Sequence, residues 1–165
     1  MTRRCRFATA VLIVLVTVNG CKKDDEAPTQ PGGGSTNTTS CNFSTDVVAV
    51  SGSNHSIVKY NCSGSGLSEF LIDSGATTAS GVVLSFEAGT GIPAAGSYLI
   101  TADAAHVNTG QVYVEFYDAS TAWHGTTDTV HVAEGGAGRI YTFCSLTLTA
   151  GGTNTKTVSL RATCP

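Results

Sequence analysis

The chain has 165 residues, of which 41% are hydrophobic and 13% are charged, and its formal net charge is −3. This length fits a single domain with a core of its own. Only 9 Lys and Arg stand against 12 Asp and Glu, so the composition argues against a protein that binds nucleic acid by neutralising phosphates.

The first twenty residues have the organisation of a signal peptide. An apolar run spans residues 7–18, which is too short to cross a bilayer as a helix but matches a signal-peptide hydrophobic region. Positive charges precede the run, carried by Arg3, Arg4 and Arg6. We therefore expect residues 1–20 to be removed from the mature protein.

The end of this segment, Val18-Asn19-Gly20-Cys21, resembles a bacterial lipobox, with a small residue directly before the cysteine. The resemblance implies that Cys21 receives a diacylglyceryl group on its sulfur and that its new amino group is acylated after cleavage. Each buried methylene contributes about 0.8 kcal/mol, so several acyl chains hold a protein that one chain holds only marginally. The alternative is an ordinary signal peptide with a chance cysteine.

The next residues, Lys22-Lys23-Asp24-Asp25-Glu26, resemble the Lys-acidic-acidic signal that sends lipoproteins of the Bacteroidota to the outer face of the outer membrane. The resemblance implies a lipid-anchored, surface-exposed protein, whereas a solvated spacer is the alternative interpretation. Residues 27–40 are dominated by Pro, Gly, Ser and Thr, which cannot pack a core. We therefore expect residues 21–40 to form a lipidated flexible tether.

Four cysteines remain beyond the expected anchor, namely Cys41, Cys62, Cys144 and Cys164. An even number in an oxidising compartment predicts two disulfides, although four cysteines allow three connectivities. We favour Cys41–Cys62 and Cys144–Cys164, because a hairpin around residues 51–55 and another at the C-terminus would place these cysteines opposite each other. A metal site is not expected, because the cysteines form no C-x-x-C pair.

Residues 41–165 are rich in Gly, Ser, Thr and Val, which favours strands and turns over helices. Short strands at regular spacing predict a single antiparallel β-sandwich, immunoglobulin-like or jelly-roll-like, of eight to nine strands. The candidate strands are Asp46–Val50, Ser56–Cys62, Leu67–Ile72, Val82–Phe86, Gly96–Thr101, Gln111–Tyr117, Thr129–Ala133, Arg139–Thr149 and Thr157–Cys164. In the last hairpin we expect Leu146 opposite Ala162 and Leu148 opposite Leu160.

Alternation of apolar and polar residues is clearest in residues 111–117 and 157–164. Such a period of two predicts strands with one buried face and one wet face. The expected buried residues are Val112, Val114, Phe116, Val158, Leu160, Ala162 and Cys164. The opposite face of the first strand would present Tyr113, Glu115 and Tyr117.

Motifs for catalysis or cofactor binding are not found in the sequence. It contains no G-x-S-x-G and no H-E-x-x-H, and its glycine runs precede strand-like sequence, as hairpin turns do. The four histidines, at positions 55, 106, 124 and 131, and the carboxylates are scattered. We therefore predict no catalytic, cofactor-binding or metal-binding residue.

Aromatic residues give the best functional indication. Tyr113 and Tyr117 are expected on an outer face, and Trp123 and His124 follow in an expected loop. Exposed rings beside polar groups can stack on sugars or anchor a protein partner. In the alternative, the tyrosines brace a second sheet and Trp123 closes the end of the core.

These observations lead to a hypothesis with two rivals. The leading one is a non-enzymatic, surface-anchored lipoprotein whose β-sandwich presents a sheet face or a loop to a partner. The first rival is a glycan-binding module that uses Tyr113, Tyr117, Trp123 and His124. The second is a small extracytoplasmic hydrolase that gathers His124 or His131 with a carboxylate. A β-sandwich hosts many functions, so the fold does not choose among them.

Overall fold

The computed structural model describes residues 41–76 and 79–165. The expected signal peptide, the acylated Cys21 and the tether of residues 21–40 lie outside the described residues. The predicted all-β fold is confirmed, because every regular element in the described part is a strand. Within that part, no helix is long and apolar enough to cross a membrane.

The described residues form ten strands, one more than the largest number predicted. They are β1 (Val47–Val50), β2 (Ser53–Cys62), β3 (Leu67–Ile72), β4 (Ser80–Phe86), β5 (Gly96–Thr101), β6 (Gln111–Asp118), β7 (Thr121–Gly125), β8 (Thr129–Gly135), β9 (Gly138–Ala150) and β10 (Asn154–Cys164).

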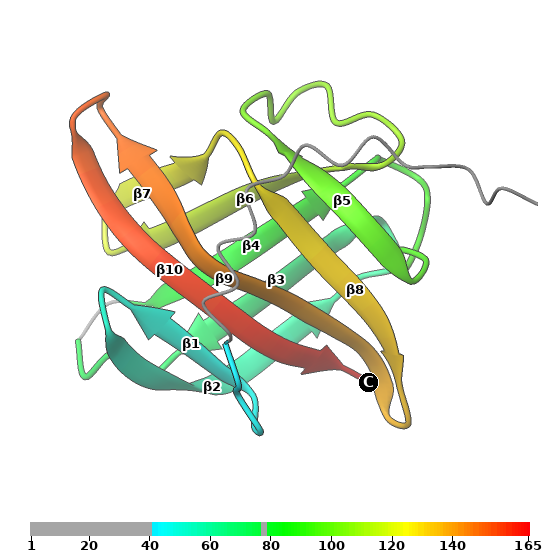
Figure 1. Ribbon diagram of the computed structural model, residues 1–165, viewed down its shortest axis with the longest axis horizontal. Helices are drawn as coiled ribbons and strands as arrows, with labels where there is room; N and C mark the ends of the chain where they lie inside the picture. The colour runs from blue at the N-terminus through cyan, green and yellow to red at the C-terminus, as the bar shows by residue number, and fades with distance from the viewer. Residues whose placement is uncertain (1–40, 77–78) are drawn as a thin grey trace, which may run out of the picture. The chain divides into compact units, whose positions relative to one another are not determined.

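The strands form two packed layers that belong to one continuous sheet (Figure 1). β3, β4 and β6 lie behind β10, β9 and β8 in this view. Strand pairing runs from β10 through β1, β2, β3 and β4 to β6. Two paths then connect β6 to β9. One part of β6 pairs with β5, which leads through β8 to β9, and the other part pairs with β7, which pairs with β9 directly. Since β9 also pairs with β10, the hydrogen-bonded ring closes around one core. The β5–β6 pair is parallel, and the other pairs are antiparallel.

The additional strand, β7, covers residues for which the sequence predicted a loop. A tight turn joins it to β6, and Ala119 in this turn has a φ of 54°. Hairpin turns of this kind usually carry Gly, Asn or Asp at positions with positive φ. Because Ala119 and Ser120 give no such signal, the hairpin could not be recognised from the sequence.

The core consists of the inward-facing side chains of all ten strands. The buried sets predicted for β6 and β10 are confirmed, because each of their members is at most 3% exposed. Tyr141 is also buried and packs near Phe70 and Phe86, with ring centroids 5.7 and 6.0 Å away. The alternation in the sequence therefore predicted the orientation of these two strands.

The predicted disulfide pairing is wrong, because the structure joins Cys41 to Cys144 and Cys62 to Cys164. The strand β1 begins only at Val47, and the chain before it does not continue along β2. Instead, the Asp46 carboxylate accepts hydrogen bonds from the backbone N–H of Thr163 (2.9 Å) and from the side chains of Thr163 and Arg161. These bonds direct the chain across β10, so Cys41 reaches β9 and not Cys62.

The expected register of the last hairpin is also wrong. The strands continue to Ala150 and Asn154, which pair across a short turn in which Gly151 and Gly152 have positive φ. Leu146 therefore faces Val158, and Leu148 faces Lys156. In this register Cys164 lies opposite Arg139, too far along the strand to meet Cys144.

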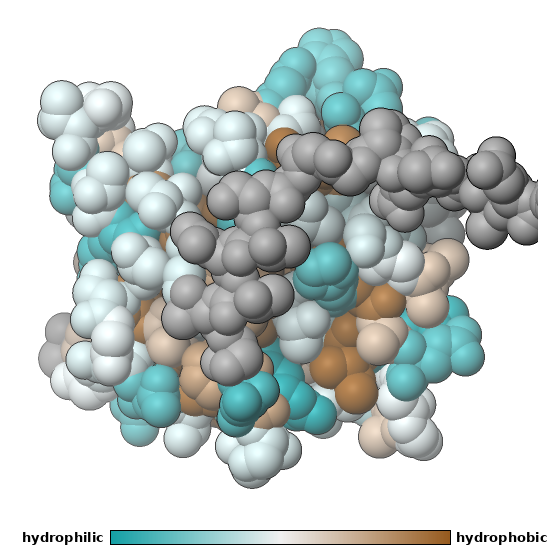
Figure 2. Space-filling model, viewed as in Figure 1, coloured by the Kyte–Doolittle hydropathy of each residue, from teal (hydrophilic) through white to brown (hydrophobic). Residues whose placement is uncertain are grey.

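The surface drawn in Figure 2 is mostly hydrophilic or intermediate, with a hydrophobic patch near the C-terminal end of β10. Few large apolar side chains of the described residues are exposed, and these are Val58, Tyr60, Leu67, Ile92 and Leu99. Single exposed apolar residues are common on protein surfaces and need no functional explanation.

Candidate functional site

The candidate site lies on the outer face of β6. The inward residues of this strand alternate with Tyr113, Glu115 and Tyr117, which point outward. His124 of β7 pairs opposite Glu115, and Val83 of β4 lies opposite Glu115 on the other side. Glu69 of β3 pairs opposite Val83 and so occupies the same face. We call Glu69, Tyr113, Glu115, Tyr117 and His124 the outer-face cluster.

One half of the cluster is a three-residue network. The Tyr113 hydroxyl donates to Glu115 Oε2 (3.3 Å) and also contacts Nδ1 of His124. Nδ1 of His124 lies 3.4 Å from the same Glu115 oxygen, and the two rings are 5.4 Å apart between centroids. The network therefore holds an imidazole, a phenol and a carboxylate in mutual contact.

The other half depends on a close approach between strands. The Tyr117 hydroxyl donates to Glu69 Oε1 (3.0 Å), although β4 lies between their strands. The phenol passes over Gly81 of β4, where a Cβ atom would come within 2.9 Å of the phenolic oxygen. A glycine at this position lets the Tyr117 ring lie along the sheet, so the ring is half-buried.

The charge of the cluster comes from its two carboxylates. Burial and the neighbouring Glu115 raise the pKa of Tyr113 to about 12, and burial and the hydrogen bond to Glu69 raise the pKa of Tyr117 to about 12. Both phenols therefore stay neutral and donate to the carboxylates at physiological pH. The cluster is rich in acceptor oxygens, so it suits a ligand that donates hydrogen bonds.

The expectation that Trp123 is exposed in a loop is wrong. Trp123 lies on β7 with its side chain in the core, and it is only 5% exposed. Its ring packs against Phe116, with centroids 5.7 Å apart, and Nζ of Lys156 lies 4.0 Å from its centroid. The alternative left open by the sequence, in which Trp123 packs in the core, is what the structure shows.

Tyr113 is also more covered than expected, since it is 9% exposed. The outer face therefore brings together Tyr113, Tyr117 and His124 of the predicted set, with Tyr117 and His124 the more accessible. No family model, curated protein or solved structure matches this chain. The site is therefore judged on its own geometry.

The other histidines lie apart from the cluster. His131 contacts the Ser97 hydroxyl (3.0 Å), His106 contacts Asp103 (2.9 Å), and His55 contacts the backbone oxygen of Asp73 (3.3 Å). Of the two histidines proposed for a hydrolase, His124 meets a carboxylate and His131 meets a serine. Among residues 41–76 and 79–165, no three potential ligands are grouped to hold a metal ion.

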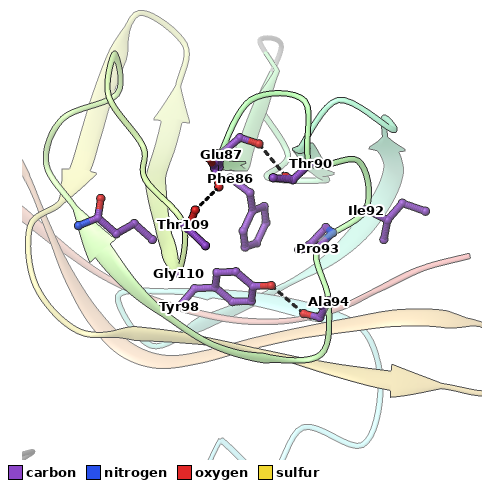
Figure 3. Close-up of a pocket in the computed structure, with 10 residues that line it drawn as sticks. Phe86, Glu87, Thr90, Ile92, Pro93, Ala94, Tyr98, Thr109 and Gly110 are labelled. Carbon is purple, nitrogen blue, oxygen red and sulfur yellow. Dashed lines mark hydrogen bonds between the residues drawn. The ribbon is translucent and has the colours of Figure 1, made fainter. Parts of the chain in front are cut away.

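A cavity of about 240 Å³ lies where the connection between β4 and β5 folds over the C-terminal end of β4 (Figure 3). The rings of Phe86 and Tyr98 meet edge to face at its centre, with centroids 4.9 Å apart. Its main polar groups are already paired, because Thr109 donates to Glu87 (2.6 Å) and Tyr98 donates to the Ala94 carbonyl (2.9 Å). This cavity offers mainly apolar walls to a ligand.

Proposed function

We propose that this protein is a lipoprotein anchored to the bacterial outer membrane through Cys21 and exposed at the cell surface, and that its β-domain is a non-enzymatic binding module. The lipobox-like sequence and the charged residues after it support this location. The two disulfides agree with it, because such bonds persist in oxidising compartments outside the cytoplasm.

The observation that carries the binding role is the outer-face cluster. Its two carboxylates can accept hydrogen bonds from hydroxyl groups, and the Tyr117 ring offers a flat apolar surface to the C–H face of a sugar. The side chains of Glu115 and His124 are 28% and 39% exposed, so they can be reached from solvent. A glycan is the ligand class that this arrangement suits best.

The contact between His124 and Glu115 favours hydrolysis as a second candidate function, because an imidazole beside a carboxylate can act as a general base. A cluster on a sheet face excludes water poorly, which suits recognition better than chemistry. Release of product from a panel of ester and glycoside substrates, abolished by His124→Ala, would favour the hydrolase instead.

The binding proposal is tested by applying the mature protein to a glycan array. We expect binding to at least one neutral glycan, and loss of that binding in Tyr117→Ala and Glu69→Gln. Tyr60→Ala is the matched control, because Tyr60 is 52% exposed and pairs opposite the buried Phe70, on the other face of the sheet from the cluster. Absence of binding to every glycan, or equal loss in the Tyr60 variant, would refute the proposal.

A further inference from the structure

A second polar site lies inside one end of the closed sheet. The inward-facing series on β6 is apolar from Val112 to Phe116 and then ends in Asp118. On β10 the inward series of Val158 and Leu160 begins with Lys156, which pairs opposite the buried Leu148. The apolar lining of the core therefore gives way to opposite charges at this end.

Strands β2 and β4 and the residues after β3 continue the same pattern. Ser80 of β4 pairs opposite Asp118, and Ser53 and His55 of β2 pair opposite the inward-facing Val50 and Val48 of β1. These side chains surround a cavity of about 240 Å³, which we call the mouth cavity. Its polar lining consists of Ser53, His55, Ser74, Ser80, Asp118 and Lys156.

The polar groups of the mouth cavity are held in a fixed arrangement. Lys156 Nζ lies 3.3 Å from Asp118 Oδ2, and the Ser80 hydroxyl donates to Asp118 Oδ1 (2.9 Å). The hydroxyls of Ser74 and Ser80 are 3.3 Å apart. Lys156 also lies over the Phe116 ring, with Nζ 5.1 Å from its centroid. Ser80 therefore holds Asp118 in place and the Phe116 ring holds Lys156, and the net charge of the ion pair is zero.

Fold stability alone gives little reason for this pair. An ion pair that is partly withdrawn from water gains little over apolar side chains of the same size, because desolvation offsets the attraction. The Lys156 and Asp118 side chains are 24% and 38% exposed, so they are partly desolvated and still accessible to a ligand. Apolar residues at these inward positions would extend the core instead.

We propose that the mouth cavity binds one neutral sugar residue. A sugar hydroxyl can donate to Asp118 and accept from Lys156 at once, which preserves their ion pair. A charged or zwitterionic ligand would have to break that pair. Phe116, Ile72 and Val50 provide the apolar wall that the C–H groups of a sugar ring contact. The cavity is smaller than those that hold drug-sized ligands, so it admits a single ring.

This site is separate from the outer-face cluster and goes beyond the function proposed above. It can be followed directly, because Trp123 is the chain's one tryptophan and its ring lies beneath Lys156. We suggest titrating the mature protein, in a detergent without a sugar head group, with neutral hexoses, pentoses and N-acetylhexosamines. Glucuronate and glycine serve as charged and zwitterionic probes. For at least one neutral sugar, we expect a saturable change in Trp123 fluorescence and a heat of binding in calorimetry. For glucuronate and glycine we expect neither.

Variants locate the binding. Ser53→Val places a larger apolar side chain in the mouth of the cavity at an exposed strand position, and we expect it to weaken binding by about tenfold or more. Asp118→Asn keeps the shape but removes the charge, and we expect a similar loss. Ser56→Val is the matched control, because Ser56 lies on the same strand and pairs opposite Val47, on the outward face.

The proposal would be overturned by three results. One is the absence of any response to the neutral sugars. Another is unchanged binding in Ser53→Val. The last is equal binding of glucuronate or glycine. Because Ser53 lines the mouth cavity and is not part of the outer-face cluster, failure at the mouth cavity is distinguishable from failure of the glycan-array experiment.

Discussion

The phenol of Tyr117 lies against the backbone of β4 at Gly81. A Cβ atom on Gly81 would stand 2.9 Å from the phenolic oxygen and 2.7 Å from the carbonyl oxygen of Phe70. Both distances are shorter than side-chain carbons tolerate. The glycine therefore allows the hydroxyl of Tyr117 to reach Glu69 on the far side of β4.

Replacing Gly81 with alanine should force the phenol of Tyr117 away and overpack the sheet. We expect a loss of about 1–3 kcal/mol in the free energy of unfolding, measured by urea denaturation. Gly136→Ala is the control, because a Cβ at Gly136 meets nothing within 4 Å. Equal stability of the two variants would show that Gly81 is not crowded.

Tyr113 and Tyr117 should make the fold sensitive to alkali. Their pKa values rise from 10.0 to about 12, so they contribute stability below pH 10 that is lost as the pH rises toward 12. Tyrosinate absorbance should show both phenols titrating late, and Tyr117→Phe should remove one late component. Glu69→Gln should lower the pKa of Tyr117 only partly, because burial is the larger cause.

Asp118 should behave in the opposite way at low pH. The hydrogen bond from Ser80, followed by Lys156, holds the pKa of Asp118 below its ordinary value of 3.8. Its contribution to stability is present above that value and is lost as the pH falls through the lowered pKa. By carboxyl NMR titration, Ser80→Ala and Lys156→Met should each raise this pKa. Ser74→Ala, whose hydroxyl contacts Ser80 and not Asp118, should have little effect.

Both disulfides should contribute strongly to stability. They join cysteines 103 and 102 residues apart, and closing loops of about 100 residues restricts the unfolded chain greatly. Replacing both cysteines of either pair with alanine should cost about 2–5 kcal/mol, measured by urea denaturation under oxidising conditions. Mass spectrometry of unreduced peptides should recover Cys41 linked to Cys144. A Cys41–Cys62 peptide would contradict the structure.

Cys21→Ser should release the protein from the membrane fraction, because the acyl chains attach to that residue in the proposed anchor. Fractionation followed by immunoblotting measures the change. Cys5→Ser is the matched control, since Cys5 lies within the expected signal peptide and should not alter partitioning. Unchanged partitioning of the Cys21 variant would argue against acylation.

The period of two in the sequence predicted which side chains of a strand point inward. The contacts that depend on how the strands are paired and in which register could not be predicted. Alternation alone orients Val114 inward and Tyr113 outward on β6. Predicting the disulfide partners required two facts that the sequence does not reveal, namely the length of the turn at Gly151 and the path of the chain before Val47. Glu69 joins the outer-face cluster from another strand, so finding it required the strand order.

The mouth cavity was missed for a related reason. Asp118 and Lys156 each lie one residue beyond the strands predicted from the sequence, and Ser80 and His55 lie just before theirs. Strand ends are hard to predict because a polar residue there resembles the start of a loop. The signal that could have found them was the period of two along each strand. Asp118 lies two residues after the inward-facing Phe116, and Lys156 lies two residues before the inward-facing Val158.

The bond between Cys41 and Cys144 determines where mechanical load enters the domain. A pull arriving along the backbone from the amino-terminal side reaches the middle of the long strand β9 covalently, before it reaches Val47. For a domain held by the proposed anchor, the four-residue strand β1 is thereby spared from being unzipped, because the load passes to β9, which pairs with β7, β8 and β10.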